Sequence, residues 1–267
     1  MTPSQQHMSG RDVTGMASGA LRHGRRISTS RPQWRRATRW MLGMQLYLAA
    51  WFWLIAVIVI AAALFVLDRT VGVQLSYFQF VQHGALWFPF ALMITVVAAM
   101  ITPHVANGMT RRSFAVAVLV TAAVVAVLYG LLMAVGLEIE GAVYDSFGWP
   151  HAHVANAVDD ATPMAEPWTQ GFAVSALTYA VRTAAGAVAG MLVAITYYRY
   201  GGLRATLALP LTVAPALVSQ DALANLLGDA LSLSLPALSL LTLVAPLLAA
   251  AAFYRITRTV PIAQPWS

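Results

Sequence analysis

Two histidines and two aspartates in one polar stretch have the residue types of a metal site. His151 and His153 are separated by one residue, and Asp159 and Asp160 follow them. Two imidazoles and a carboxylate are ligands that zinc and other transition metals accept. The His-Glu-x-x-His signature, which gives zinc enzymes two ligands one helical turn apart and a general base, is absent. The sequence therefore favours a solvated acidic loop, with an extracytoplasmic metalloenzyme as an alternative.

The composition excludes several kinds of catalysis on this chain. All 16 basic residues are arginine, and cysteine is absent. The chain thus lacks a P-loop lysine, a Schiff-base lysine and a thiolate nucleophile. It also lacks the Gly-x-Ser-x-Gly nucleophile elbow. We expect no catalytic, cofactor-binding or metal residue here, and if ATP drives the protein, another chain binds it.

Two features stand out in a long apolar run near residue 180. Arg182 lies deep within it, where a charge costs about 2.5 to 3.5 kcal/mol on insertion scales. It should therefore face protein or water, either as a structural ion pair, as a side chain that extends to the interface from a tilted helix, or as a substrate-pathway residue or gate. Its candidate partners are Glu138, Glu140 and Glu166. Gly186 and Gly190 form a Gly-x-x-x-Gly match, which predicts close packing between helices, with dimerisation as an alternative.

Length and composition are those of a polytopic membrane protein. Of 267 residues, 59% are hydrophobic and 10% are charged, and the mean hydropathy is +0.69. Apolar runs that can cross about 30 Å of hydrocarbon recur along the chain. We expect an all-α domain over residues 45–258 with six transmembrane helices, followed by a tail at 259–267. The expected spans are residues 45–67, 84–101, 114–137, 171–198, 203–220 and 236–254. Prolines 210 and 215 should kink the fifth.

Two segments precede the first span. Residues 1–30 are rich in Ser, Thr, Gly, Gln and Arg, which predicts a disordered basic arm. In residues 31–44, apolar side chains recur every three or four positions and arginines share another face, which predicts an interfacial amphipathic helix. The apolar positions are Trp34, Ala37, Met41 and Met44, and the basic ones are Arg35, Arg36 and Arg39. The alternative is the cytoplasmic end of the first span, with its arginines extended to the interface.

The arginines predict the orientation of the chain. Eight lie within the first 39 residues, and six more lie in alternate loops or near the C-terminus. Because arginine-rich loops stay in the cytoplasm, we expect both termini there. The same rule gives a cytoplasmic elbow at 102–113 and an extracytoplasmic loop at 138–170. The pI of about 10.1 then reflects juxtamembrane arginines that suit anionic lipid, and not nucleic-acid binding.

The elbow is a short polar segment between two apolar runs. Residues 107–114 read Asn-Gly-Met-Thr-Arg-Arg-Ser-Phe. This segment resembles the Asn-Gly-x-Ser/Thr-Arg-Arg/Lys-x-Phe pattern between the second and third membrane helices of ABC-2-type transporter permeases, particularly actinobacterial ones. The six-span layout resembles that family as well. Without the resemblance, the arginines of the elbow would be read only as determinants of membrane orientation.

The resemblance implies a fold, partners and a set of contact residues. It implies the ABC-2-type permease fold, a cytoplasmic ATPase subunit that carries ATP and Mg, and a second permease subunit, either identical or paralogous. The elbow would be a coupling helix that docks on the ATPase, with Arg111 and Arg112 as charged contacts and Gly108 permitting the turn. The complete set of coupling residues is Asn107, Gly108, Met109, Thr110, Arg111 and Arg112. Short re-entrant helices within residues 222–236 and location in a bacterial plasma membrane are also implied.

The function expected from the resemblance is ATP-driven transport, with export favoured over import. The chain would not be catalytic by itself. A stand-alone secondary transporter or channel is the main alternative, although the internal repeat typical of such proteins is not evident. The sequence does not indicate the substrate.

Overall fold

The computed structural model describes residues 33–154, 165–220 and 234–261, which are almost entirely helical. Five of its helices are long and apolar enough to cross a membrane. They are Gln33–Thr70, Phe78–Ala106, Arg111–Phe147, Phe172–Tyr200 and Ala237–Thr259. The prediction of a helical, membrane-embedded protein is therefore confirmed, with five such helices in the described part of the chain.

The helices follow one another with short connections. In chain order they are α2 (Gln33–Thr70), the 3₁₀ turn η1 (Phe78–Phe80), α3 (Val81–Ala106), α4 (Arg111–Phe147), α5 (Phe172–Tyr200), α6 (Gly202–Leu207), α7 (Leu209–Val218) and α9 (Leu235–Thr259). Four predicted spans correspond to α2, α3, α4 and α5, and the last corresponds to α9.

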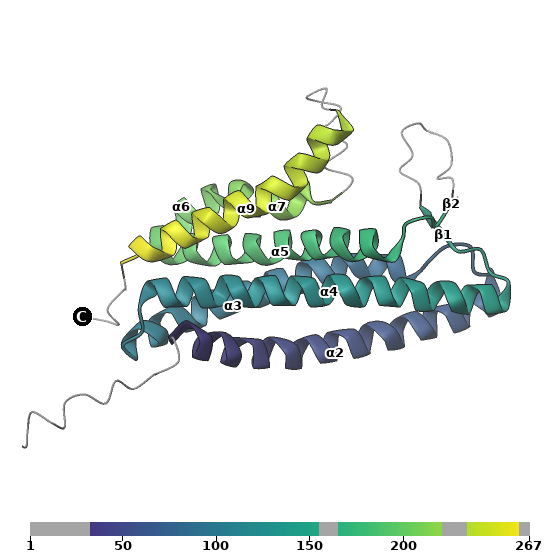
Figure 1. Cartoon of the computed structure of the whole chain (residues 1–267), viewed down its shortest axis with the longest axis horizontal. Coiled ribbons are helices and arrows are strands. Elements are labelled where there is room, and N and C mark those ends of the chain that lie inside the picture. Colours follow the sequence, from purple (N-terminus) through teal and green to yellow (C-terminus); the bar gives the residue numbers. More distant parts are fainter. Residues whose placement is uncertain (1–32, 155–164, 221–233, 262–267) are drawn as a thin grey trace, which may run out of the picture. The chain divides into compact units, whose positions relative to one another are not determined.

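Helix α5 lies at the centre of the bundle. It packs against α3 and α4 on one side and against α7 and α9 on another, as Figure 1 shows. Every residue from Ala185 to Thr196 is buried. Alanine and glycine are frequent in this stretch, so neighbouring helices can approach its backbone closely.

The Gly-x-x-x-Gly match forms the contact between α5 and α3. A Cβ atom placed on Gly186 would overlap the carbonyl oxygen of Leu86, and one on Gly190 would overlap that of Phe90. Nearby, the Thr183 hydroxyl donates to the Ala85 carbonyl over 3.2 Å. The predicted packing role of the two glycines is thus confirmed, and the helix that they meet belongs to the same chain.

The N-terminal helix differs from the predicted pair of segments. Residues 31–44 and 45–67 were expected as an interfacial helix and a span, but α2 is one helix of 38 residues. At about 1.5 Å per residue it is about 57 Å long, more than a bilayer core requires. Gly43 is the only glycine or proline in α2, and it does not interrupt the helix. The predicted interfacial segment is therefore continuous with the first predicted span, and its position along the membrane surface stays a prediction.

The fifth predicted span, residues 203–220, forms two short helices. Together α6 and α7 occupy Gly202–Val218, and this stretch falls below the length of the five spanning helices. The chain bends near Ala208, just before Pro210, which has no N–H to donate to the preceding turn. The kink was predicted, whereas a sixth membrane crossing stays a prediction.

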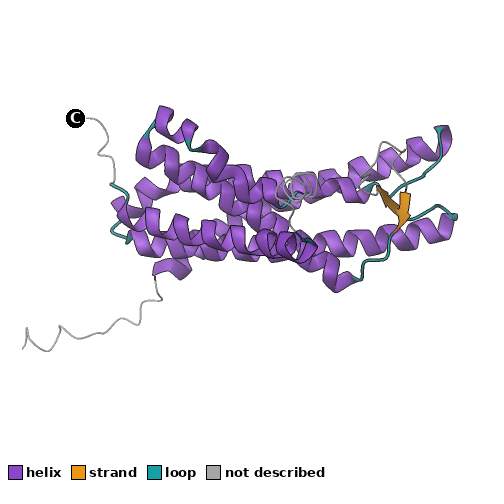
Figure 2. Cartoon of the chain, turned by 90° about the horizontal axis from the view of Figure 1, so that it is seen from above, coloured by secondary structure: helices purple, strands orange, loops and turns teal. Residues whose placement is uncertain are grey.

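The predicted loop 138–170 begins later than expected. Helix α4 continues ten residues past Leu137 to Phe147, and the next residue, Gly148, terminates it with a left-handed φ of 70°. Beyond it, β1 (Ala152–Val154) pairs antiparallel with β2 (Ala165–Pro167), with His153 opposite Glu166. Figure 2 shows this small sheet at one end of the helices. The predictions for residues 1–30 and most of 222–236 lie outside the described residues.

We predict that Gly190→Ala lowers the free energy of unfolding by about 1 to 3 kcal/mol, the usual effect of overpacking. The cause is the overlap of the new methyl group with the Phe90 carbonyl. Unfolding in mixed detergent micelles measures the change. Gly43→Ala is the matched control, because no atom lies within 4 Å of a Cβ atom placed there. Equal effects of the two changes would contradict the packing role.

Candidate functional site

The first candidate site is the connection between α3 and α4. Helix α3 ends at Asn107, whose side-chain amide donates to the Pro103 carbonyl over 2.7 Å. Gly108 follows with a left-handed φ of 76°, a conformation that glycine adopts without strain. The Met109 N–H returns to the His104 carbonyl over 3.2 Å. These contacts close the end of α3 in a tight turn.

The beginning of α4 is also held by local contacts. The Thr110 hydroxyl caps the helix by accepting from the Ser113 N–H over 3.0 Å. The Ser113 hydroxyl lies 3.3 Å from Nε2 of the buried His104, and the His104 ring meets the fully buried Phe114 edge-on. The predicted elbow 102–113 is therefore divided among the last turn of α3, a short connection and the first turn of α4. A separate coupling helix is not formed.

Two arginines stand at the surface of this connection. Arg112 is exposed and Arg111 is half-buried. Within the part of the chain that the structure describes, neither guanidinium makes a hydrogen bond or an ion pair. We call residues 107–112 the basic turn. Its shape is set by local capping, while its two charges are available to another molecule.

The ends of other helices lie near the basic turn. The Thr102 and Tyr198 hydroxyls are 3.2 Å apart and join α3 to α5. Arg199 of α5 donates to the Thr259 hydroxyl of α9 over 2.6 Å. The beginning of α4 and the ends of α3, α5 and α9 thus meet at one end of the bundle (Figure 1). Most of the arginines in the described chain are found at this basic end.

Arg182 has a partner that sequence reasoning did not name. Its guanidinium donates to the Gln82 side-chain oxygen of α3 and lies 5.8 Å from the centre of the Tyr179 ring. Three glutamates were proposed instead, and one of them, Glu140, is engaged elsewhere. Arg182 lies one helical turn before Gly186, so its bond to Gln82 supports the same α3–α5 contact. A role in a substrate pathway stays a prediction.

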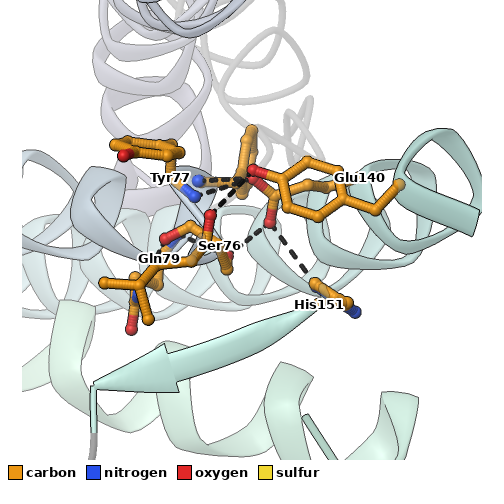
Figure 3. A network of polar contacts seen from close by, with 8 residues as sticks. Ser76, Tyr77, Gln79, Glu140 and His151 are labelled. Atoms are coloured by element: carbon orange, nitrogen blue, oxygen red, sulfur yellow. Dashed lines mark hydrogen bonds and ion pairs between the residues drawn. The ribbon is translucent and has the colours of Figure 1, made fainter. Parts of the chain in front are cut away.

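The second candidate site surrounds Glu140, a carboxylate that is only 5% exposed. Figure 3 shows its contacts. The Ser76 hydroxyl donates to one carboxylate oxygen, and the backbone N–H groups of Tyr77 and Phe78 donate to the other over 2.9 and 2.8 Å. Because Tyr77 and Phe78 begin η1, Glu140 of α4 caps the helical segment that leads into α3. Sequence reasoning missed this role.

Strand β1 is held by the same network of contacts around Glu140. Nε2 of His151 lies 3.6 Å from the same Glu140 oxygen that accepts from the Ser76 hydroxyl, and the Ser76 N–H donates to the Ala152 carbonyl over 2.7 Å. The Tyr144 hydroxyl donates to the Leu75 carbonyl over 3.0 Å. His151 and the residues around Glu140 therefore hold β1 against the outer part of α4. The arrangement offers no open oxygen to a substrate.

The described residues do not complete the metal site that the sequence offered as an alternative. Among them, no group of three His, Cys, Asp or Glu side chains is placed to hold a metal ion. His151 faces Glu140, while His153 packs edge-on against Trp168. Asp159 and Asp160 lie outside the described residues.

Comparison with known proteins yields no assignment. The chain matches no family model, no curated protein and no solved structure.

The role of Glu140 did leave a signal in the sequence. Met133, Leu137, Glu140 and Tyr144 recur at spacings of four, three and four, and all four are buried on one face of α4. An acidic residue within such an apolar stripe must be bonded when buried. The identity of its donors, some 60 residues earlier in the chain, could not be read from this spacing.

We predict that Glu140→Ala lowers the free energy of unfolding by about 3 kcal/mol or more, because three donors would lose a charged acceptor. Glu140→Gln should have a smaller effect, since it keeps the shape and one oxygen. Detergent-micelle unfolding measures both. Glu138→Ala is the control, because Glu138 is exposed on the same helix. Equal effects at 138 and 140 would rule out the capping role.

We further predict that Gly108→Ala destabilises the protein by about 1 to 2 kcal/mol, the cost of a left-handed conformation in a residue with a Cβ atom. Gly108→Asn should recover part of the loss, because asparagine tolerates this conformation better. No atom lies within 4 Å of the added Cβ, so a steric clash would not explain the effect. If Gly108→Ala were as stable as the wild type, the turn would adopt another backbone conformation without cost, and the prediction would be wrong.

Proposed function

We propose that this chain is the membrane-spanning permease subunit of an ATP-binding cassette transporter. A separate cytoplasmic ATPase subunit, which carries ATP and Mg, binds the basic turn. The observation that carries the proposal is the combination of a rigid turn with two adjacent arginines whose charges are not used within the described chain. The resemblance of residues 107–114 to the ABC-2-type pattern supports the same assignment.

The contacts of the basic turn would allow it to transmit a movement of the ATPase to the membrane helices. Caps fix it to α3 and α4, and Phe114 at its C-terminal side is fully buried. Helices α3 and α4 both pack against α5. A displacement of the turn therefore moves several helices together. The coupling arises because the ATPase holds the turn differently before and after nucleotide binding, since a contact of equal strength in both states would shift nothing.

The rest of the assembly follows from the same proposal. The basic end faces the cytoplasm, as arginine-rich membrane flanks do. A second permease subunit, identical or paralogous, completes the pathway, and the direction of transport is export. The broad exposed apolar surface of α2 is available to lipid or to that subunit. The substrate is not specified by any described side chain.

We predict that reversing both charges, Arg111→Glu with Arg112→Glu, reduces the co-purified ATPase by at least about tenfold, because like charges across an interface cost several kcal/mol. The protein is purified from its native membrane in mild detergent. The retained proteins are identified, and ATP hydrolysis is measured with and without the double change.

The control is the double reversal of Arg204 and Arg255, which are exposed on α6 and α9 near the same end. It keeps the net charge of the test variant but leaves the basic turn intact. An ATPase retained by the control and lost with the changed turn supports the proposal. If folded wild-type protein retains no ATPase, the proposal is wrong, and the Arg182–Gln82 pair becomes the first place to test for secondary transport.

A further inference from the structure

A pocket of about 320 Å³ lies between the beginning of α2 and the end of α3. We call it the α2–α3 pocket. Helix α2 contributes Arg36, Ala37, Trp40 and Met41, and the other wall consists of Met100, Pro103, His104, Asn107 and Met109. The pocket thus borders the basic turn, but Arg111 and Arg112 do not line it.

The walls of the pocket are suited to a hydrocarbon chain. Met41, Met100 and Met109 are flexible apolar side chains that adapt to irregular partners. Trp40 is 56% exposed although it lies on a membrane helix. Tryptophan at such a position usually marks the level of the lipid headgroups. An apolar pocket at this level can accept the beginning of an acyl chain.

One positively charged side chain lines the pocket, and a second lies close to it. Arg36 lines it, and Arg39 stands three residues later on the same side of α2. Both are exposed, and within the described residues neither guanidinium forms a hydrogen bond or an ion pair. Arg35, in contrast, lies over the Trp34 ring at 5.4 Å. An exposed guanidinium beside an apolar pocket matches the phosphate of a phospholipid whose acyl chain enters the pocket.

We propose that the α2–α3 pocket binds one anionic phospholipid. Its phosphate contacts Arg36, and the beginning of one acyl chain lies between Trp40 and the methionines. The larger cavity of about 430 Å³ between α2 and α4 lacks this combination, because no cation lines it and the Glu140 carboxylate at its edge is already bonded. A bound lipid would join α2 to the end of α3, two helices that make few direct contacts with each other.

The test measures lipid binding to the purified full-length chain. Phosphatidylglycerol and phosphatidylcholine are titrated separately, and bound lipid is counted by native mass spectrometry. We expect a saturable site for phosphatidylglycerol. Arg36→Gln should weaken it about fivefold, the effect of about one charge near a membrane surface. Inorganic phosphate should not displace the lipid, because it cannot fill the apolar walls.

Two matched controls separate this site from general attraction to lipid. Arg255→Gln removes an exposed charge near the basic end without touching the pocket, and it should leave binding unchanged. Trp40→Ala should weaken binding, whereas Trp51→Ala should not, although Trp51 is 51% exposed on the same helix. Phosphatidylglycerol with brominated chains should quench tryptophan fluorescence in a saturable step that Trp40→Phe abolishes and Trp51→Phe preserves.

Three results would overturn the proposal. Equal losses of lipid binding with Arg36→Gln and Arg255→Gln would show that general electrostatic attraction, and not this pocket, holds the lipid. Equal affinities for phosphatidylglycerol and phosphatidylcholine would show that the site does not recognise the charge of the headgroup. Absence of the saturable quenching, together with loss of a co-purified protein in Arg36→Gln, would assign the pocket to a protein partner. None of these outcomes depends on whether reversal at Arg111 and Arg112 releases an ATPase.

Discussion

The close approach of α5 to the backbone of α3 is the contact on which the bundle depends. Inside a membrane, helices gain little from the hydrophobic effect, so their association relies on close packing and a few polar contacts. Gly186 and Gly190 allow the packing, and the bonds from Thr183 and Arg182 to α3 add the polar contacts. Because α4, α7 and α9 also pack on α5, the same helix supports them all.

Helix α3 is held at both ends by groups on α4. At its beginning, the buried Glu140 carboxylate accepts from η1, and burial of this charge is tolerated because strong donors replace water. At its end, the basic turn joins it to the first residues of α4 by caps and by the His104–Phe114 contact. With both ends fixed and α5 packed along its length, α3 cannot move independently of α4.

Hydropathy was sufficient to locate the long helices, but not their ends or their polar contacts. Helix α4 extends beyond its apolar run because no glycine or proline follows Gly141 until Gly148. Helix α2 includes the amphipathic segment because its one glycine, Gly43, does not end the helix. The turn residues Asn107 and Gly108 were recognisable as local signals. The Arg182–Gln82 bond was not, because it depends on the register of two helices 100 residues apart in the chain.

Helix α2 is attached differently from the other helices, and this difference bears on how the bundle can move. Its most apolar stretch is unburied within this chain, and its described contacts are with α3 and α4. The α2–α3 pocket interrupts those contacts at the basic end. A movement that enters at the basic turn would pass directly to α3, α4 and α5 through buried side chains. It would reach the beginning of α2 through the buried Ala37 and Met41, which belong to the same apolar cluster as Phe114. A molecule in the pocket would therefore add to the contacts by which the beginning of α2 follows the rest of the bundle.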